Sequence, residues 1–354
     1  MVKGFRNILS DLIKDSLSAP AAAMFTDRRR RKTKTPPRNM CSEICESRVL
    51  LSATQLTGTA GNDVFTLTYD GSASGNVDVS ISSNGRASTS IGTFSMASGL
   101  AIDGFGGTDT VKAVGTTGAD FYVVSGGSLT INGSQLSLMR VENRTLAGLS
   151  GSDTYRFDTD TQLGKLTIDD SGGSRDLLDF SPTTTAAVKV NLNTASSQTI
   201  NRNLRLSLSA GNSIEDALGG AGNDVLLGNA LDNRFQGGAG NDYMNGFAGS
   251  DILVGGDGND TYAFTTATSP EADSIIESAA VTGGRDEIRF NAVTTSVFVN
   301  LSSTANQSVH KNRTFDGKRI DQLLFRRPRK ATDPLGRVRP SFNNVSARSR
   351  QAFR

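Results

Sequence analysis

The fold of this 354-residue chain is decided by five consecutive nine-residue segments that begin at Gly219. They read Gly-Gly-Ala-Gly-Asn-Asp-Val-Leu-Leu (219–227), Gly-Asn-Ala-Leu-Asp-Asn-Arg-Phe-Gln (228–236), Gly-Gly-Ala-Gly-Asn-Asp-Tyr-Met-Asn (237–245), Gly-Phe-Ala-Gly-Ser-Asp-Ile-Leu-Val (246–254) and Gly-Gly-Asp-Gly-Asn-Asp-Thr-Tyr-Ala (255–263). A short fixed period indicates a repeat architecture, in which each unit buries its apolar side only by stacking on its neighbours.

Each position of the nonapeptide has a physical role. The first six positions form a turn and the last three form a short strand, so two nonapeptides complete one coil and equivalent turns recur in every second nonapeptide. Glycines at positions 1, 2 and 4 permit positive φ and let backbone carbonyls approach an ion. Aspartate at position 6 supplies the hard anionic oxygen that Ca²⁺ prefers. The apolar residue at position 8 should point inward; these residues are Leu226, Phe235, Met244, Leu253 and Tyr262.

The pattern Gly-Gly-x-Gly-x-Asp-x-U-x, with U apolar, resembles the repeat of RTX, or haemolysin-type, calcium-binding proteins. The resemblance is strict over 219–263 and looser over about 55–310. It implies an all-β fold, a parallel β-roll or β-solenoid built on glycine-aspartate nonapeptides, with disordered or helical basic ends. It also implies an exported protein with Ca²⁺ as its cofactor.

We expect calcium between turns that stack two nonapeptides apart. Asp224 and Asp242 would share one ion, and Asp242 and Asp260 another. On the opposite side Asn233 faces Asp251; because Asn233 is uncharged and a leucine replaces a turn glycine, we expect a weaker third site. The predicted metal residues are Gly220, Gly222, Asp224, Asn233, Gly238, Gly240, Asp242, Gly249, Asp251, Gly256, Gly258 and Asp260.

Glycine-aspartate turns can also end the strands of a solenoid without binding metal. Four isolated copies of the turn have no partner at the distance of two nonapeptides, and we interpret them mainly as solenoid turns. They end at Asp63, Asp109, Asp120 and Asp153.

Charge divides the chain into three parts. Residues 1–54 carry a net charge of +6, residues 55–310 carry −14, and residues 311–354 carry +10. The middle part also holds 35 of the 38 glycines. Without cations its carboxylates repel one another, and glycine-rich turns are entropically costly to order, so we expect the body to fold on calcium binding.

Several classes of protein are excluded by composition. No apolar run approaches the length of about 18 residues that a membrane-spanning helix needs, so we expect no transmembrane segment. His310 is the only histidine, which rules out a His-Glu-x-x-His zinc helix, and there is no Gly-x-Ser-x-Gly elbow or phosphate-binding loop. We therefore expect no enzyme but a structural or adhesive protein, whose partners beyond calcium would be surface or matrix polysaccharide or protein, and no specific nucleic acid.

Two alternatives stay open. One is an extracellular β-helix enzyme acting on polysaccharide, with acid pairs such as Asp158 and Asp160, or Asp169 and Asp170, although the chain has no tryptophan to form a sugar platform. The other is a truncated fragment of a larger RTX protein.

A longer repeat overlies the nonapeptides. Asp153-Thr-Tyr-Arg-Phe157 recurs as Asp260-Thr-Tyr-Ala-Phe264, and Val190-Asn-Leu192 recurs as Val299-Asn-Leu301. The offset between the two copies is nearly constant along the sequence. After Asn312 the second copy gives way to a basic tail without strand periodicity, so we expect this copy to be cut short.

The N-terminal segment points to export. Residues 1–18 have amphipathic helical spacing, interrupted by charges that a secretory signal would lack. Residues 45–53, Cys-Glu-Ser-Arg-Val-Leu-Leu-Ser-Ala, resemble the LEPR-XLL motif near the start of large bacterial surface proteins; Cys45 and Ser47 depart from it. This resemblance implies a cell-surface or extracellular location.

These features divide the chain into six segments. They are a basic export-associated segment (1–54), a glycine-rich solenoid-like region (55–157), a strand region with the first long repeat (158–218), the RTX calcium-binding β-roll (219–264), a strand region with the truncated second copy (265–311) and a basic disordered tail (312–354).

Overall fold

The computed structural model describes residues 54–72, 75–170, 172–173, 175–265, 271–277 and 284–290, and the strands at 307–310, 313–318 and 323–325. The amphipathic segment and the LEPR-XLL-like motif of residues 1–53 lie outside the described residues, as do residues 326–354. The described residues belong to one compact unit.

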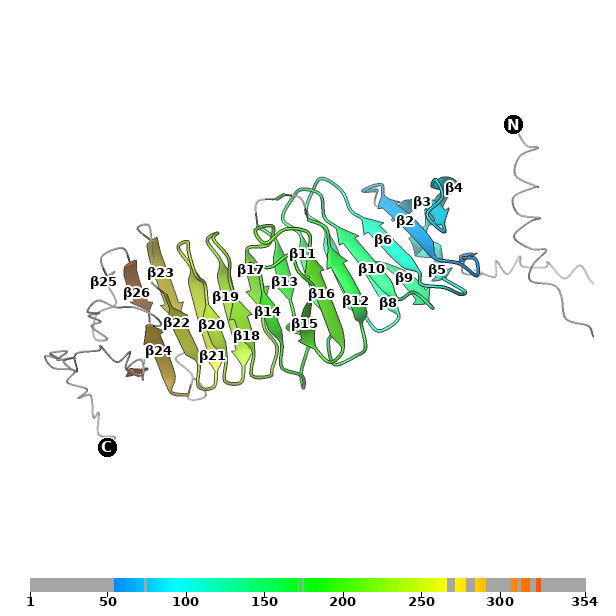
Figure 1. Cartoon of the computed structure of the whole chain (residues 1–354). Helices are drawn as coiled ribbons and strands as arrows, with labels where there is room; N and C mark the ends of the chain where they lie inside the picture. Colours follow the sequence, from blue (N-terminus) through cyan, green and yellow to red (C-terminus); the bar gives the residue numbers. More distant parts are fainter. Residues whose placement is uncertain are drawn as a thin grey trace, which may run out of the picture. The chain divides into compact units, whose positions relative to one another are not determined.

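Strands form three sheets, which we name A, B and C (Figure 1). In spatial order, the 13 strands of sheet A are β1 (Thr54–Thr57), β5 (Leu100–Asp103), β9 (Ser134–Met139), β8 (Ser128–Ile131), β7 (Phe121–Ser125), β11 (Thr154–Phe157), β13 (Leu177–Asp179), β17 (Asp216–Leu218), β19 (Arg234–Ala239), β21 (Ile252–Asp257), β23 (Glu271–Ile276), β26 (Arg313–Lys318) and β25 (Gln307–His310).

Sheets B and C are smaller. The 8 strands of sheet B are β15 (Gln198–Asn201), β16 (Leu204–Leu208), β12 (Gly164–Ile168), β10 (Asn143–Ala147), β6 (Thr110–Val114), β2 (Asp63–Tyr69), β3 (Asn76–Ser83) and β4 (Thr89–Ser95). The 6 strands of sheet C are β14 (Lys189–Asn191), β18 (Val225–Leu227), β20 (Tyr243–Asn245), β22 (Thr261–Phe264), β24 (Asp286–Phe290) and β27 (Leu323–Phe325).

The nonapeptides build the regular part of the stack. The chain alternates between sheets A and C from β17 to β24, and neighbouring strands of each sheet are parallel. Arg234 pairs with Ile252 in sheet A and Val225 pairs with Tyr243 in sheet C, so two nonapeptides make one coil, as the period predicts. The all-β, parallel-roll fold is therefore confirmed.

The core is a column of side chains between the sheets. All five position-8 residues named above are completely buried, which confirms their inward direction. Outside the nonapeptides the same core continues through aromatic contacts, with Tyr122 stacked on Tyr155 at 5.1 Å and Phe157 against Phe180 at 5.3 Å between ring centroids. The buried apolar side chains of the irregular coils and of the nonapeptides therefore form one continuous core.

The coils are less regular before residue 216 than after it. Antiparallel hairpins are inserted in sheet A at β7, β8 and β9, and in sheet B at β2, β3 and β4. One 3₁₀ turn, η1 (Met96–Ser98), is the only helical element among the described residues. No helix in the described part of the chain has the length and apolarity needed to cross a membrane.

The strand order continues past Asn312, where we expected a tail without structure. β25 and β26 form an antiparallel hairpin, β26 pairs in parallel with β23, and β27 pairs in parallel with β24. The prediction of a structureless tail from residue 312 is therefore wrong for 313–318 and 323–325. Backbone pairing with an existing sheet edge outweighs the weak strand propensity of a segment that contains Asp316 and Gly317.

Replacement of a position-8 residue should destabilise the stack. Phe235→Ala removes a completely buried ring between two coils, so we expect the free energy of unfolding to fall by about 3–5 kcal/mol in calcium. Chemical denaturation measures this loss. Met139→Ala is the control, since Met139 is 43% exposed, and it should change stability by about 0.5 kcal/mol or less. Equal losses in the two variants would contradict the proposed core.

Candidate metal centre

The position-6 carboxylates stack along the edge of sheet C where its strands begin. The Asp224 N–H donates to Asp242 Oδ1 at 2.7 Å, and the Asp242 N–H donates to Asp260 Oδ1 at 2.8 Å. Each of the three residues is at most 2% exposed. The sequence predicts that Asp224, Asp242 and Asp260 stack, because they lie two nonapeptides apart. The structure places them on successive coils in this way.

In the described part of the chain, the second carboxylate oxygen has a hydrogen-bond partner in Asp224 but not in Asp242 or Asp260. Asp224 Oδ2 accepts the N–H of Gly220 at 2.6 Å. Asp242 Oδ2 and Asp260 Oδ2 are buried and have no hydrogen-bond partner among the described residues. Buried anionic oxygens without a donor are costly, because desolvation is not repaid by a hydrogen bond. The two oxygens therefore have the capacity to accept a cation.

Glycine carbonyls complete an oxygen-rich lining. Gly238 and Gly240 both have φ of +113°, in the left-handed region that favours glycine. A Cβ on Gly238 would collide with the Gly220 carbonyl oxygen, and one on Gly240 with that of Gly222. The same contacts recur one coil later, between Gly256 and the Gly238 carbonyl and between Gly258 and the Gly240 carbonyl.

Glycine is required at position 1 of the nonapeptide for a different reason. Gly237 does not have positive φ, which corrects our expectation that positions 1, 2 and 4 all use that conformation. A Cβ on Gly237 would instead collide with Asp242 Oδ2. In the first repeat Gly220 and Gly222 also lack positive φ. Position 1 is therefore glycine because the carboxylate lies against its backbone.

The turns on the opposite side of the coils, at Asn233 and Asp251, offer a cation fewer available oxygens. The Asn233 N–H donates to Asp251 Oδ1 at 2.9 Å, so these two residues do stack. However, Asn233 Oδ1 accepts the Asn229 N–H at 3.0 Å, and its amide donates to the Glu215 carbonyl at 2.8 Å. On the next coil, a Cβ on Gly249 would collide with the Leu231 carbonyl. The weaker third site stays a prediction, supported by this use of the Asn233 amide within the protein.

Burial dominates the electrostatics of the sheet C row. Burial, with the charges of Asp260 and Asp224, raises the pKa of Asp242 from 3.8 to about 8. Burial, with the charges of Asp286 and Asp257, raises the pKa of Asp260 to about 6, and burial also raises the pKa of Asp224. Without a cation, burial therefore favours the protonated form of these three carboxyl groups.

The isolated turns also stack, at spacings that sequence reading missed. The Asp63 N–H donates to Asp109 Oδ1 at 2.8 Å, 46 residues away, and the Asp120 N–H donates to Asp153 Oδ1 at 2.7 Å, 33 residues away. A glutamate, Glu142, continues the first row by accepting the Asp109 N–H. The sequence signal for these rows is an acidic residue at the start of a strand, independent of the spacing between the acids.

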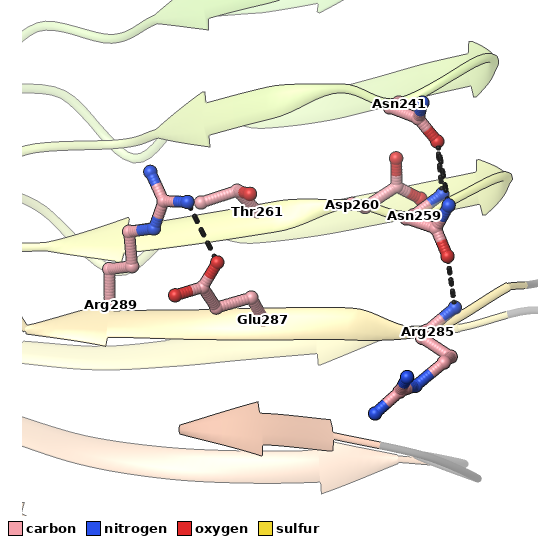
Figure 2. Close-up of a pocket in the computed structure, with 7 residues that line it drawn as sticks. All are labelled: Asn241, Asn259, Asp260, Thr261, Arg285, Glu287 and Arg289. Carbon is pink, nitrogen blue, oxygen red and sulfur yellow. Dashed lines mark hydrogen bonds and ion pairs between the residues drawn. The ribbon is translucent and has the colours of Figure 1, made fainter. Parts of the chain in front are cut away.

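A second row of side chains crosses the coils at position 5. The Asn241 N–H donates to Asn223 Oδ1 and the Asn259 N–H to Asn241 Oδ1, both at 2.7 Å, and the Arg285 N–H donates to Asn259 Oδ1 at 2.8 Å. Figure 2 shows the part of this row formed by Asn241, Asn259 and Arg285. These three residues line a pocket together with Asp260, Thr261, Glu287 and Arg289. The recurrence of asparagine in every second nonapeptide was a signal for it.

The donor set fits calcium. Carboxylate and carbonyl oxygens converge on the turns, and Ca²⁺ takes six to eight oxygen ligands. The residues that would hold it are Asp224, Asp242 and Asp260, with the carbonyls of the glycines at positions 2 and 4.

Substitution at a turn glycine should weaken calcium binding. Gly240→Ala places a methyl group against the Gly222 carbonyl at a left-handed φ, so we expect a loss of about 1–3 kcal/mol and a higher calcium midpoint in a folding titration. Gly118→Ala is the matched control, since its Cβ meets only Thr116 Oγ1 at 3.6 Å without positive φ. An unchanged midpoint in Gly240→Ala would contradict the assignment.

The metal-free protein should lose stability as pH rises. The folded pKa of Asp242 is about 8 and its ordinary value is 3.8, so the folded state binds the extra proton between these values. The contribution of Asp242 is therefore fully present below about pH 4 and is lost as pH rises through about 8. Denaturation in chelator at several pH values measures this slope. Asp242→Asn should flatten it, and an equally steep slope in that variant would exclude Asp242 as its source.

Comparison with known protein families identifies the family of this chain. A family model described as Peptidase M10 serralysin C terminal matches residues 145–324, which include the five nonapeptides and most of both long repeats. No match is found among curated proteins. The matching family consists of the RTX repeat β-roll of secreted proteins, and the match does not include the catalytic part of serralysin. The chain belongs to the Peptidase M10 serralysin C-terminal family.

Proposed function

We propose that this chain is an exported protein whose repeat body folds on Ca²⁺ and then serves as a rigid structural or adhesive module. The observation that carries the proposal is the pair of buried oxygens, Asp242 Oδ2 and Asp260 Oδ2, that have no hydrogen-bond partner among the described residues and lie beside carbonyl-lined turns. A bound cation would offset both their desolvation and their mutual repulsion.

The energy available from calcium is sufficient for a folding switch. Extracellular calcium modules bind at about 10⁻⁴–10⁻³ M. At ten times Kd each site adds about 1.4 kcal/mol, and three sites add about 4 kcal/mol. That sum approaches the whole stability of a small domain, about 5–15 kcal/mol. A body that is loose at low calcium and folded at millimolar calcium follows from these magnitudes.

A structural role is favoured over catalysis by what the candidate acids do. Asp160 accepts hydrogen bonds from the backbone N–H groups of Thr184, Thr185 and Ala186, which holds one loop in place. Asp169 forms an ion pair with Lys112 at 3.0 Å. Acids held in such contacts are not arranged as a general acid and base facing a substrate.

A surface location is the natural setting for such a module. The family occurs in secreted proteins, and residues 45–53 resemble a motif of bacterial surface proteins. Extracellular calcium modules have affinities of about 10⁻⁴–10⁻³ M, which suits sites that fill outside the cell. Partners of this module would be surface or matrix polysaccharide or protein.

Calcium titration of the full chain tests the folding switch. We expect the far-UV circular dichroism of the chelated protein to gain β signal on addition of Ca²⁺, with saturation near millimolar. Magnesium should not substitute, because it demands smaller octahedral sites. A combined Asp224→Asn and Asp242→Asn variant should shift the midpoint upward at least tenfold. Identical stability of the wild type in calcium and in chelator by calorimetry would refute the proposal.

A further inference from the structure

Two groups of three buried acids lie at corresponding places in the two long repeats. We call Asp153, Asp170 and Asp176 the first triad, and Asp260, Glu277 and Asp286 the second triad. In each triad one carboxylate oxygen per residue lies within 4.8 Å of those of the other two. Every member is at most 4% exposed. The first triad lies outside the nonapeptides and shares no residue with the predicted calcium sites.

Topology brings the first triad together. Asp153 and Asp176 directly precede β11 and β13, which are neighbouring parallel strands of sheet A. Asp170 follows β12, the strand that returns the chain along sheet B between them. The start of one strand and the end of the returning strand lie at the same edge of the coil, so the three carboxylates meet.

The first triad has oxygens that the protein leaves unused. Asp153 Oδ1 accepts the Asp120 N–H and Asp176 Oδ1 accepts the Asp153 N–H, each at 2.7 Å. Asp153 Oδ2 and Asp176 Oδ2 are buried with no hydrogen-bond partner among the described residues. Within the same part of the chain, no lysine or arginine forms an ion pair with either aspartate.

A tyrosine hydroxyl fixes the third acid in both triads. Tyr155 Oη donates to Asp170 Oδ2 at 2.7 Å, and Tyr262 Oη donates to Glu277 Oε1. The tyrosine O–H thereby orients one oxygen of the third carboxylate, Asp170 in the first triad and Glu277 in the second. Both copies therefore repeat the arrangement of two acids on one sheet and one acid on the other.

A glycine opens onto each triad. A Cβ on Gly148 would collide with Asp153 Oδ2 and Tyr155 Oη, and a Cβ on Gly255 would collide with Asp260 Oδ2 and Tyr262 Oη. The unused oxygen of Asp153 thus points to the same place as the tyrosine hydroxyl that holds Asp170. The second triad has the same arrangement of glycine, acid and tyrosine. This arrangement is therefore a feature of the long repeat.

We propose that the first triad binds one Ca²⁺ ion, at a site additional to those of the nonapeptides. The donors are carboxylate oxygens alone, with no nitrogen or sulfur ligand, which selects a hard cation. Three ionised carboxylates buried together repel one another, and a bound cation offsets that repulsion. The ion would join β11, β12 and β13, so it would tie sheet A to sheet B ahead of the nonapeptide coils.

Metal content and terbium luminescence together test this site on the full chain. The first readout is calcium bound per chain, measured by atomic absorption after gel filtration in calcium buffer. We expect a variant carrying Asp170→Asn and Asp176→Asn to hold one ion fewer than the wild type and to keep its β signal. The same calcium content in the wild type and in this folded variant would overturn the proposal.

The second readout uses tyrosine-sensitised emission of Tb³⁺, since the chain contains no tryptophan. The difference in emission between wild type and Tyr155→Phe reports the first triad. That difference should persist in Asp242→Asn, which damages the nonapeptide row, and vanish in the triad variant. If the Tyr155-dependent difference in emission persisted in the triad variant, the site would be excluded. If the difference is kept in Asp242→Asn, the first triad binds independently of the nonapeptide sites.

A milder variant covers failure of the double variant to fold. Asp170→Asn alone can still accept the Tyr155 hydrogen bond, so its fold should be kept. We expect the Tyr155-dependent terbium titration to shift at least tenfold to higher concentration. An unchanged titration in Asp170→Asn would refute the triad as a cation site.

Discussion

Burial of like-charged carboxylates in register, coil after coil, is the constraint on which this structure depends. Each position-6 aspartate of the sheet C row accepts a backbone N–H from the coil before it, so the backbone at the turn needs the acid. The acid in turn needs glycine next to it, because a Cβ on Gly237 would occupy the place of the carboxylate. It also needs a positive charge or a proton. Turn sequence and coil height are therefore consequences of one arrangement, and the calcium dependence that we propose rests on the same arrangement.

The sequence predicts the nonapeptide region well because every coil there has the same length. A strict period gives the register, the inward direction of Phe235 and the stacking of Asp242 on Asp260 directly. Elsewhere the coils carry hairpins and loops, so Asp120 finds Asp153 at a spacing that no fixed period contains. The role of Glu142 and the strands after residue 312 depend on pairing with distant backbone, which local pattern does not encode.

The long repeat shows a related limit. In the first copy β11 lies in sheet A and β12 in sheet B, whereas their equivalents β22 and β23 lie in sheets C and A. The hairpin register is nevertheless the same, with Gln198 opposite Leu206 and Gln307 opposite Phe315. The two copies are therefore separated by an odd number of half-coils. A constant sequence offset reveals the repeat but not the face of the roll on which each copy lies.

The rows of carboxylates run in one direction, and this gives the stack two chemically different ends. The acids of these rows reach back to the coil before them, as Asp286 does to the Asp260 N–H and Asp273 to the Asp251 N–H. A cut between coils would leave main-chain donors on the N-terminal piece and bare carboxylate oxygens on the C-terminal piece. Each coil is thus completed by its successor, so a coil without its C-terminal neighbour has a main-chain N–H donor that lacks its carboxylate acceptor.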